Sequence, residues 1–376
     1  MNKPALVCSK CDKSYMNSEP VWRCTCGGLL DIDFTPDFSD GWVDGSRAGL
    51  WRYRSAIPIE NDRNIVSFGE GNTPLMPFDI ADRDVYLKLD HLLPSGSFKD
   101  RGATALVSKI KELAIDKIVE DSSGNAGASI AEYSAKAGID CSIYVPASTS
   151  EAKTLQIRAS GASLVLVPGS REDTAQAVLA EAKHRYYASH SWNPWFFQGV
   201  KTVAYEICEH LGWKSPDSVV LPVGNGTLVL GAIIGFQELF SAGIIAKIPR
   251  IIAVQTASCC PLASAFKSGS GRPETVVTQV TVAEGIAVAE PVRGKQILDA
   301  VRKSDGQILT VSEQEITSSW NEMAELGLYV EPTSAVAWAG VKQYSKVVSE
   351  NEVIVSIITG HGLKAAKGIQ AILDNE

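Results

Sequence analysis

A lysine at the start of a helical pattern is the residue of this chain that is best placed for covalent chemistry. Lys99 follows the turn-forming run Pro94-Ser95-Gly96-Ser97 and an aromatic residue, and an amphipathic helical pattern begins directly after it. A free ammonium is unfavourable there, because the helix dipole is positive at its N-terminus. The position suits an amine held as a Schiff base to a cofactor aldehyde. The alternative is a solvated lysine that follows a helix-capping Ser97.

Two glycine-rich stretches favour the first interpretation. Residues 121–128 read Asp-Ser-Ser-Gly-Asn-Ala-Gly-Ala, and residues 221–228 read Leu-Pro-Val-Gly-Asn-Gly-Thr-Leu. Each stretch follows an apolar run and opens a helical pattern, where backbone N–H groups are free to bind anions. The sequence therefore predicts one reactive lysine and two anion-binding loops.

Together these motifs resemble the pyridoxal-phosphate enzymes of the tryptophan-synthase β type, and within them the threonine synthases. The matching segments are Gly-Ser-Phe-Lys-Asp-Arg-Gly (96–102), Ser-Ser-Gly-Asn-Ala-Gly (122–127) and Thr-Gly-His-Gly-Leu-Lys (359–364). They occur in the family's order and span most of residues 65–370. The resemblance implies a pyridoxal 5'-phosphate lyase of fold type II.

The resemblance also assigns a role to each motif. Lys99 is expected to bind the cofactor aldehyde and, as the free amine, to move protons at Cα and beyond. Asn125 is expected to bind the ring hydroxyl and Thr359 the pyridine nitrogen. The expected cofactor ligands are Phe98 at the ring, Lys99, Asn125, the phosphate loop Gly224, Asn225, Gly226, Thr227 and Leu228, and Thr359. The loop Ser122, Ser123, Gly124 and Ala126 is expected to hold the substrate carboxylate.

A hydroxyl opposite the ring nitrogen has a chemical consequence. Thr359 carries no charge to keep that nitrogen protonated, unlike an aspartate, so the ring is expected to be a weaker electron sink. Such a ring suits elimination and replacement at Cβ and Cγ better than transamination.

For threonine synthases the resemblance implies O-phospho-L-homoserine and water as substrates. The segment 189–202 carries the family's Asn-Pro…Gly-x-Lys-Thr pattern, but Trp195 and Phe196 stand where an arginine is expected to bind the substrate phosphate. This predicts a bulkier and less cationic wall. The missing charge could come from His190, Ser191, Lys201 or Arg158.

Three alternatives therefore stay open. One is a cysteate synthase, which replaces the phosphate of O-phosphoserine with sulfite. Another is a serine or threonine dehydratase, although Gly-Asn-Gly-Thr at 224–227 differs from the glycine tetrad usual in dehydratases. The third is a catalytically silent relative that binds an amino acid or a partner.

Four cysteines near the N-terminus have spacings typical of a metal site. Cys8, Cys11, Cys24 and Cys26 form two knuckles separated by twelve residues, close to the pattern of a four-cysteine zinc ribbon. One knuckle is Cys-x-Cys, so a ribbon that has lost its metal is the alternative. Four thiolates leave no open position on zinc, which predicts a structural rather than a catalytic ion.

Apolar strand patterns alternate with amphipathic helical patterns over most of the chain, which predicts an α/β fold with parallel sheets covered by helices on both faces. We expect a zinc-ribbon-like segment over residues 1–40. A large cofactor-binding domain is expected over 41–85 and 205–376, and a small mobile domain over 86–204, with the active site in the cleft between the two domains.

Composition restricts the class of partner. The 376 residues carry a net charge of −8 with no basic run, which argues against nucleic acid as a partner. The sequence has no signal pattern and no apolar run long enough for a bilayer, so we expect a cytoplasmic enzyme that binds a small amino acid. The resemblance implies a homodimer.

Overall fold

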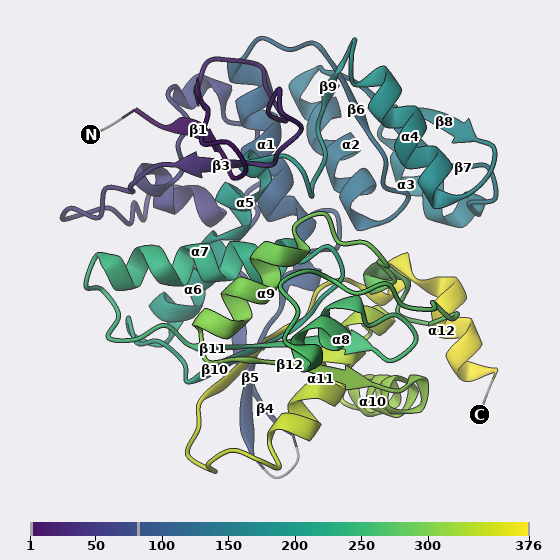
Figure 1. Ribbon diagram of the computed structural model, residues 1–376. Helices are drawn as coiled ribbons and strands as arrows, with labels where there is room; N and C mark the ends of the chain where they lie inside the picture. The colour runs from purple at the N-terminus through teal and green to yellow at the C-terminus, as the bar shows by residue number, and fades with distance from the viewer. Residues whose placement is uncertain (1–2, 81–82, 375–376) are drawn as a thin grey trace. The chain divides into compact units, whose positions relative to one another are not determined.

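The computed structural model describes residues 3–80 and 83–374, which fold as two compact units (Figure 1). The first unit comprises Met1–Gly71 and Lys99–Val200, and the second comprises Asn72–Phe98 and Lys201–Glu376. The chain therefore crosses between the units three times. One crossing is the peptide bond between Phe98 and Lys99.

The first unit begins with a small antiparallel sheet in the order β2-β1-β3. Its strands are β1 (Ala5–Cys8), β2 (Ser14–Met16) and β3 (Leu30–Asp33). Cys8 ends β1, Cys11 lies in the loop that follows it, and Cys24 and Cys26 lie in the loop before β3. The four sulfur atoms all lie within 4.8 Å of one another. The expected cysteine cluster is thus present as a structural unit.

An aromatic cluster fixes this N-terminal segment to the rest of the first unit. The Trp22 ring packs edge-on against Tyr187 and Trp192, with centroid distances of 5.0 and 5.9 Å. The Arg23 guanidinium lies 4.8 Å from the centre of the Trp192 ring. Because Trp22 and Arg23 directly precede Cys24, the packing connects the cysteine cluster to the segment that contains Ser191.

A parallel sheet in the order β8-β7-β6-β9 forms the centre of the first unit. Helices α2, α3 and α4 pack against it, while α1 packs against α2 and α5. The strands are β6 (Lys117–Glu120), β7 (Asp140–Pro146), β8 (Ser163–Val167) and β9 (Tyr186–Tyr187). The helices are η1 (Gly49–Ala56), η2 (Asp62–Asn64), α1 (Lys99–Glu112), α2 (Asn125–Ala137), α3 (Glu151–Ala159), α4 (Arg171–Glu181) and α5 (Pro194–Val200).

Close packing of α5 on α1 explains two aromatic residues of the segment 189–202. A Cβ atom built on Gly102 would lie 2.3 Å from the Phe196 ring, so that ring fills the space left by the glycine. Trp195 is also buried, and its ring lies 4.5 Å from the Lys109 ammonium. These side chains pack in the interior of the unit, which corrects their interpretation as a wall of the substrate site.

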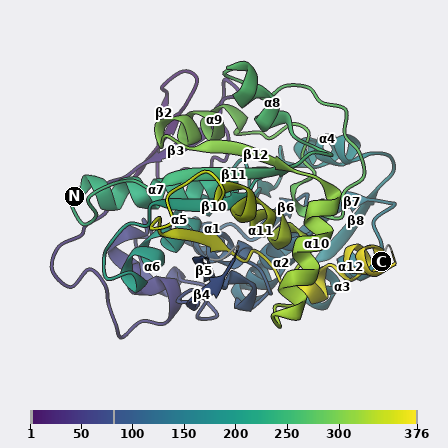
Figure 2. The same ribbon diagram turned by 90° about the horizontal axis from the view of Figure 1, so that it is seen from below.

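The second unit is built on a six-stranded sheet in the order β12-β11-β10-β13-β5-β4, part of which can be followed in Figure 2. Its strands are β4 (Leu75–Asp79), β5 (Asp84–Lys88), β10 (Ser218–Pro222), β11 (Arg250–Thr256), β12 (Gln307–Val311) and β13 (Ile354–Ile357). All neighbours are parallel except β4, which runs antiparallel to β5 at the edge. The sheet is therefore mixed, whereas the sequence predicted parallel sheets.

Several helices pack against this sheet. Helix α11 packs on β10, β11, β12 and β13, while α7 and α9 contact β11. The helices are η3 (Asp90–Leu92), α6 (Thr202–His210), α7 (Thr227–Ser241), α8 (Pro261–Ser268), η4 (Glu284–Ile286), α9 (Gly294–Lys303), α10 (Glu313–Glu325), α11 (Pro332–Tyr344), η5 (Gly362–Lys364) and α12 (Ala366–Leu373). Within the described ranges no helix has both the length and the apolar character needed to cross a membrane.

Residues 41–71 lie in the first compact unit, whereas the sequence assigned them to the large cofactor-binding domain. Trp51 donates hydrogen bonds to Glu70 and Thr104, and Tyr133 donates to the same Glu70 carboxylate. These bonds join the segment to α1 and α2 in the first unit, although the sequence assigned it to the large domain. Compactness does not define a functional domain, so the expected limits stay a prediction.

Candidate active site

Lys99 is the first residue of α1 and is partly exposed. The next residue, Asp100, is fully buried and accepts a hydrogen bond of 2.6 Å from the Ser129 hydroxyl on α2. This bond joins the first turn of α1 to the second turn of α2. The lysine is therefore held beside the N-terminus of α2, where the loop 122–125 enters that helix.

The loop between β6 and α2 depends on a glycine. A Cβ atom built on Gly127 would lie 1.8 Å from the Ser122 carbonyl oxygen, so the loop folds back more closely than any other residue allows. Ser122, Ser123 and Gly124 remain at least partly exposed, and Asn125 begins α2. Backbone N–H groups at such a helix start are able to bind a carboxylate.

Two carboxylates at the end of β6 anchor the segment that follows β9. Asp121 accepts hydrogen bonds from the Tyr187 hydroxyl at 2.6 Å and from the Arg171 guanidinium at 2.7 Å. Glu120 is bonded to His190 Nδ1 at 2.7 Å. The segment that carries His190 and Ser191 is thus held against the base of the 122–125 loop.

Burial makes the Glu120–His190 pair neutral. Desolvation, followed by the nearby Lys99 ammonium, lowers the pKa of His190 to about 3. Desolvation, followed by the negative charge of Asp121, raises the pKa of Glu120 well above its usual value. Both shifts favour the uncharged forms at neutral pH. His190 therefore does not supply the positive charge expected from an arginine.

In the second unit, the glycine-rich loop after β10 is tightly confined. A Cβ atom on Gly224 would lie 2.8 Å from Ile286 Cα, and one on Gly226 would lie 2.2 Å from Ile297 Cδ1. Gly226 also has a φ of +74°, in the left-handed region that favours glycine. Helix α7 begins at Thr227, so its free N–H groups face this loop. The geometry is that of an anion cradle.

Thr359 follows β13, which lies beside β10 in the sheet. Because the carboxyl ends of adjacent parallel strands meet at one edge, Thr359 and the loop after β10 share that edge. The Phe98 N–H donates a 2.9 Å hydrogen bond to the Thr359 carbonyl oxygen, and Ser97 forms a bridge with Gly360. Since Phe98 precedes Lys99, the lysine follows directly in the chain after a residue bonded to this edge.

A family model described as pyridoxal-phosphate dependent enzyme matches residues 66–360, which include Lys99, the loops 122–125 and 224–226, and Thr359. The chain belongs to this enzyme family. It is 34% identical to a threonine synthase of Methanocaldococcus jannaschii, with 95% of this chain and 92% of that protein aligned. It is also 34% identical to a threonine synthase of Methanosarcina acetivorans, over 96% of this chain and 92% of the relative.

Solved structures of other enzymes share the fold. A processed form of threonine deaminase isoform 2 from Solanum lycopersicum aligns with a TM-score of 0.70 at 22% identity, over 93% of this chain and 92% of that chain. Maize serine racemase aligns with a TM-score of 0.68 at 19% identity, over 81% and 92%. The chain is an α/β enzyme of fold type II, and pyridoxal phosphate is its cofactor.

The described residues fit this cofactor. The loop 224–226 is too tight for side chains yet opens onto a helix N-terminus, as a phosphate requires. The Ser97 hydroxyl is fully buried and makes no hydrogen bond within residues 3–80 and 83–374. The cofactor aldehyde needs an amine, which Lys99 carries. The pyridine ring needs polar partners, and the hydroxyls of Ser97 and Thr359 are of that kind.

The remaining expected ligands lie in buried or paired positions, or in the loop before α7. Lys201 is fully buried, and its ammonium lies 2.8 Å from Glu238 Oε1. This ion pair argues against Lys201 as a substrate ligand. Ser191 is buried with its hydroxyl 3.3 Å from that of Ser189. Phe98 and Leu228 are buried, and Asn225 lies in the loop before α7.

Sequence reasoning missed two polar residues that contact Thr359. The Thr359 hydroxyl donates a 2.7 Å hydrogen bond to Glu331 Oε1 and lies 3.0 Å from the Ser334 hydroxyl. Both residues belong to the start of α11, and Glu331 precedes its first residue, Pro332. An acidic residue before a proline at a helix start is a common cap signal, so the pattern gives no indication of a contact with Thr359.

Proposed function

We propose that this enzyme is a threonine synthase, which converts O-phospho-L-homoserine and water to L-threonine and phosphate. The observation that carries the proposal is the 34% identity to threonine synthases over almost the whole length of both chains. The motif residues at 96–102, 122–127 and 359–364 support the same assignment. The homodimer implied by the resemblance stays a prediction.

Each described motif has a role in this proposal. Bound pyridoxal phosphate supplies an electron sink for carbanions next to the amino group of the substrate. The Lys99 amine removes the proton from Cα of the substrate and then a proton from Cβ. The loop Ser122, Ser123, Gly124 and Ala126 binds the substrate carboxylate, and Asn125 orients the cofactor ring. The loop 224–228 binds the cofactor phosphate through backbone N–H groups and the Thr227 hydroxyl.

The direct test is product analysis with purified holoenzyme. With O-phosphohomoserine, we expect threonine and inorganic phosphate in equal amounts, quantified by amino acid analysis and a phosphate assay. A parallel reaction with O-phosphoserine and sulfite tests cysteate synthesis. Cysteate without threonine would reject the proposal in favour of that related activity.

The buried aromatic residues favour one further candidate. Phe196 and Trp195 pack in the interior where the resemblance leads us to expect an arginine for the substrate phosphate. Burial lowers the pKa of His190 and so favours its neutral form, and Lys201 is paired with Glu238, which leaves Arg158 of the cations considered. An unphosphorylated substrate would need no such cation, which makes a serine or threonine dehydratase the second candidate. Release of 2-oxobutanoate from threonine in a third reaction would identify it.

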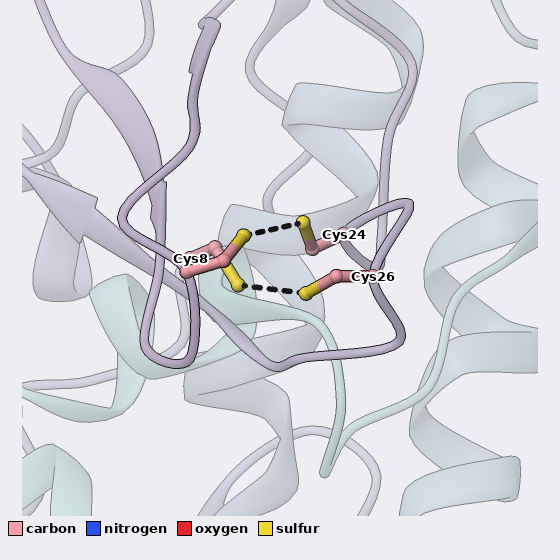
Figure 3. A group of neighbouring side chains, drawn as sticks. Cys8, Cys24 and Cys26 are labelled. Carbon is pink, nitrogen blue, oxygen red and sulfur yellow. Dashed lines mark hydrogen bonds between the residues drawn. The ribbon is translucent and has the colours of Figure 1, made fainter.

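We also propose that the N-terminal segment is a zinc ribbon. The Cys8 and Cys26 sulfur atoms lie 3.5 Å apart, with Cys24 close by (Figure 3). Those of Cys11 and Cys24 lie 3.6 Å apart. A tetrahedral zinc with Zn–S bonds of about 2.3 Å places its sulfurs about 3.8 Å apart. The Tyr15 hydroxyl donates a 3.2 Å hydrogen bond to Cys24 Sγ, as suits a thiolate ligand. This set fits a structural zinc ion.

Metal analysis tests the ribbon. We expect one zinc ion per chain, and we expect Cys24→Ser to lose it and to lower the midpoint of thermal unfolding, because the fold of this short segment depends on the ion. Cys260→Ser is the matched control, since that thiol is partly buried outside the cluster. Metal-free wild-type enzyme with unchanged thermal stability would contradict the prediction.

A further inference from the structure

Glu331 occupies the space behind Thr359 and is almost fully buried. Its Oε1 atom accepts the hydrogen bond of 2.7 Å from the Thr359 hydroxyl, and its backbone N–H donates to the Gly360 carbonyl oxygen at 2.9 Å. A Cβ atom built on Gly360 would lie 2.4 Å from the carboxyl carbon of Glu331. The glycine that follows Thr359 thus leaves room for this carboxylate.

The hydrogen bonds around Thr359 determine the direction of each proton. The Ser334 hydroxyl oxygen accepts the Thr359 backbone N–H at 3.0 Å and lies 3.0 Å from the Thr359 hydroxyl. The single hydroxyl proton of Thr359 is donated to the Glu331 carboxylate, so the Ser334 hydroxyl proton points toward Thr359 Oγ1. Thr359 Oγ1 is left with one lone pair and no proton to donate.

We propose that Glu331 is a positioning residue that makes Thr359 a hydrogen-bond acceptor, so that the site favours a protonated cofactor ring nitrogen. The inference rests on the proposed role of Thr359 as the partner of that nitrogen. A chain of two hydrogen bonds then connects a pyridinium N–H, the Thr359 hydroxyl and the Glu331 carboxylate. The carboxylate stabilises the ring charge through the hydroxyl without touching the cofactor.

This arrangement changes the chemistry expected from the sequence. A hydroxyl alone predicted an unprotonated ring and a weak electron sink. A buried carboxylate behind that hydroxyl favours the protonated ring, which withdraws electrons more strongly. Elimination at Cγ requires a carbanion at Cβ, one atom further from the ring than Cα, and a stronger sink supports this step.

The test is the nitrogen-15 resonance of the ring in holoenzyme reconstituted with ¹⁵N-labelled pyridoxal phosphate. We expect the resonance of a pyridinium in the wild type and a shift toward that of the free base in Glu331→Gln, which removes the charge but keeps an acceptor. Gly360→Ala retains the carboxylate but displaces it, and we expect the same direction of shift. A free-base resonance in the wild type would overturn the inference.

Two further variants distinguish the role of Glu331 from the role of Thr359 as the partner of the ring nitrogen. Glu313→Gln is the matched control, because that carboxylate accepts hydrogen bonds from the Thr256 and Ser258 hydroxyls in the same unit; a shift as large as that of Glu331→Gln would overturn the inference. Thr359→Val tests the assignment. An unchanged resonance in Thr359→Val would show that Thr359 does not contact the ring nitrogen and would overturn both. A free-base wild type whose resonance still responds to Thr359→Val would overturn the role of Glu331 alone.

Discussion

Replacing Lys99 with alanine is expected to reduce kcat at least about 10³-fold, because a positioned proton-transfer group contributes about 10²–10⁴-fold. The substitution removes the base for both substrate protons and the amine that binds the cofactor aldehyde. We also expect the visible absorbance of the cofactor–lysine adduct to disappear, while added cofactor still binds through the loop 224–228. Steady-state kinetics and an absorbance spectrum measure both effects.

Lys111→Ala is the matched control for this prediction. Lys111 lies in the last turn of the same helix and is exposed, so its loss removes an equal charge from α1 without removing the proposed base. We expect its kcat and its absorbance spectrum to equal those of the wild type. Retention of more than a tenth of wild-type activity in Lys99→Ala would contradict the assignment of the catalytic base.

Gly226→Ala is expected to weaken binding of the cofactor phosphate. A non-glycine residue in the left-handed region costs about 1–2 kcal/mol, and overpacking typically adds about 1–3 kcal/mol. Ile297, which the new methyl group would meet at 2.2 Å, is fully buried and has little room to move. The loop relieves this strain by moving away from its phosphate-binding geometry. We expect the Kd for the cofactor to rise about 30-fold or more, from 2 kcal/mol or more of lost binding energy.

Gly243→Ala is a control that carries the cost of a left-handed backbone at alanine but not the steric overlap with Ile297. Gly243 has a φ of +71° in the same unit, but a Cβ atom there would meet nothing within 4 Å. This control should lose about 1–2 kcal/mol of stability and keep the wild-type cofactor Kd. Cofactor titration followed by fluorescence compares the two variants. Equal Kd values for Gly226→Ala and wild type would show that the loop does not bind the phosphate.

The sequence predicted those helices, strands and turns that depend on residues close together in the chain. The helix from Lys99 and the strand before the 122–125 loop were expected from periodicity, and α1 and β6 confirm them. Glycine-rich turns between strand and helix were expected at 122–127 and 224–226, and both are present. These features depend on residues close together in the sequence, where the period of apolar residues and the turn chemistry suffice.

Tertiary contacts account for what the sequence did not predict. Glu331 meets Thr359 because α11 starts beside the end of β13, and no spacing rule connects positions so far apart in the chain. Phe196 was interpreted as part of the substrate site, but the missing side chain of Gly102 on α1 gives its ring a place in the interior. Residues 41–71 join the first unit through the buried Glu70 carboxylate, which no local pattern indicates.

The packing of Trp22 against Tyr187 and Trp192 has a consequence for folding during synthesis. Trp22 is translated well before its aromatic partners, which follow only after most of the first unit. Such contacts of high sequence separation form late, because a long loop must close before they gain any stabilisation. We therefore expect the cysteine segment to remain undocked during most of translation. Its four thiols can then bind a metal ion before Trp22 docks. If metal binding is delayed, the apolar surface of the undocked segment stays exposed and can aggregate.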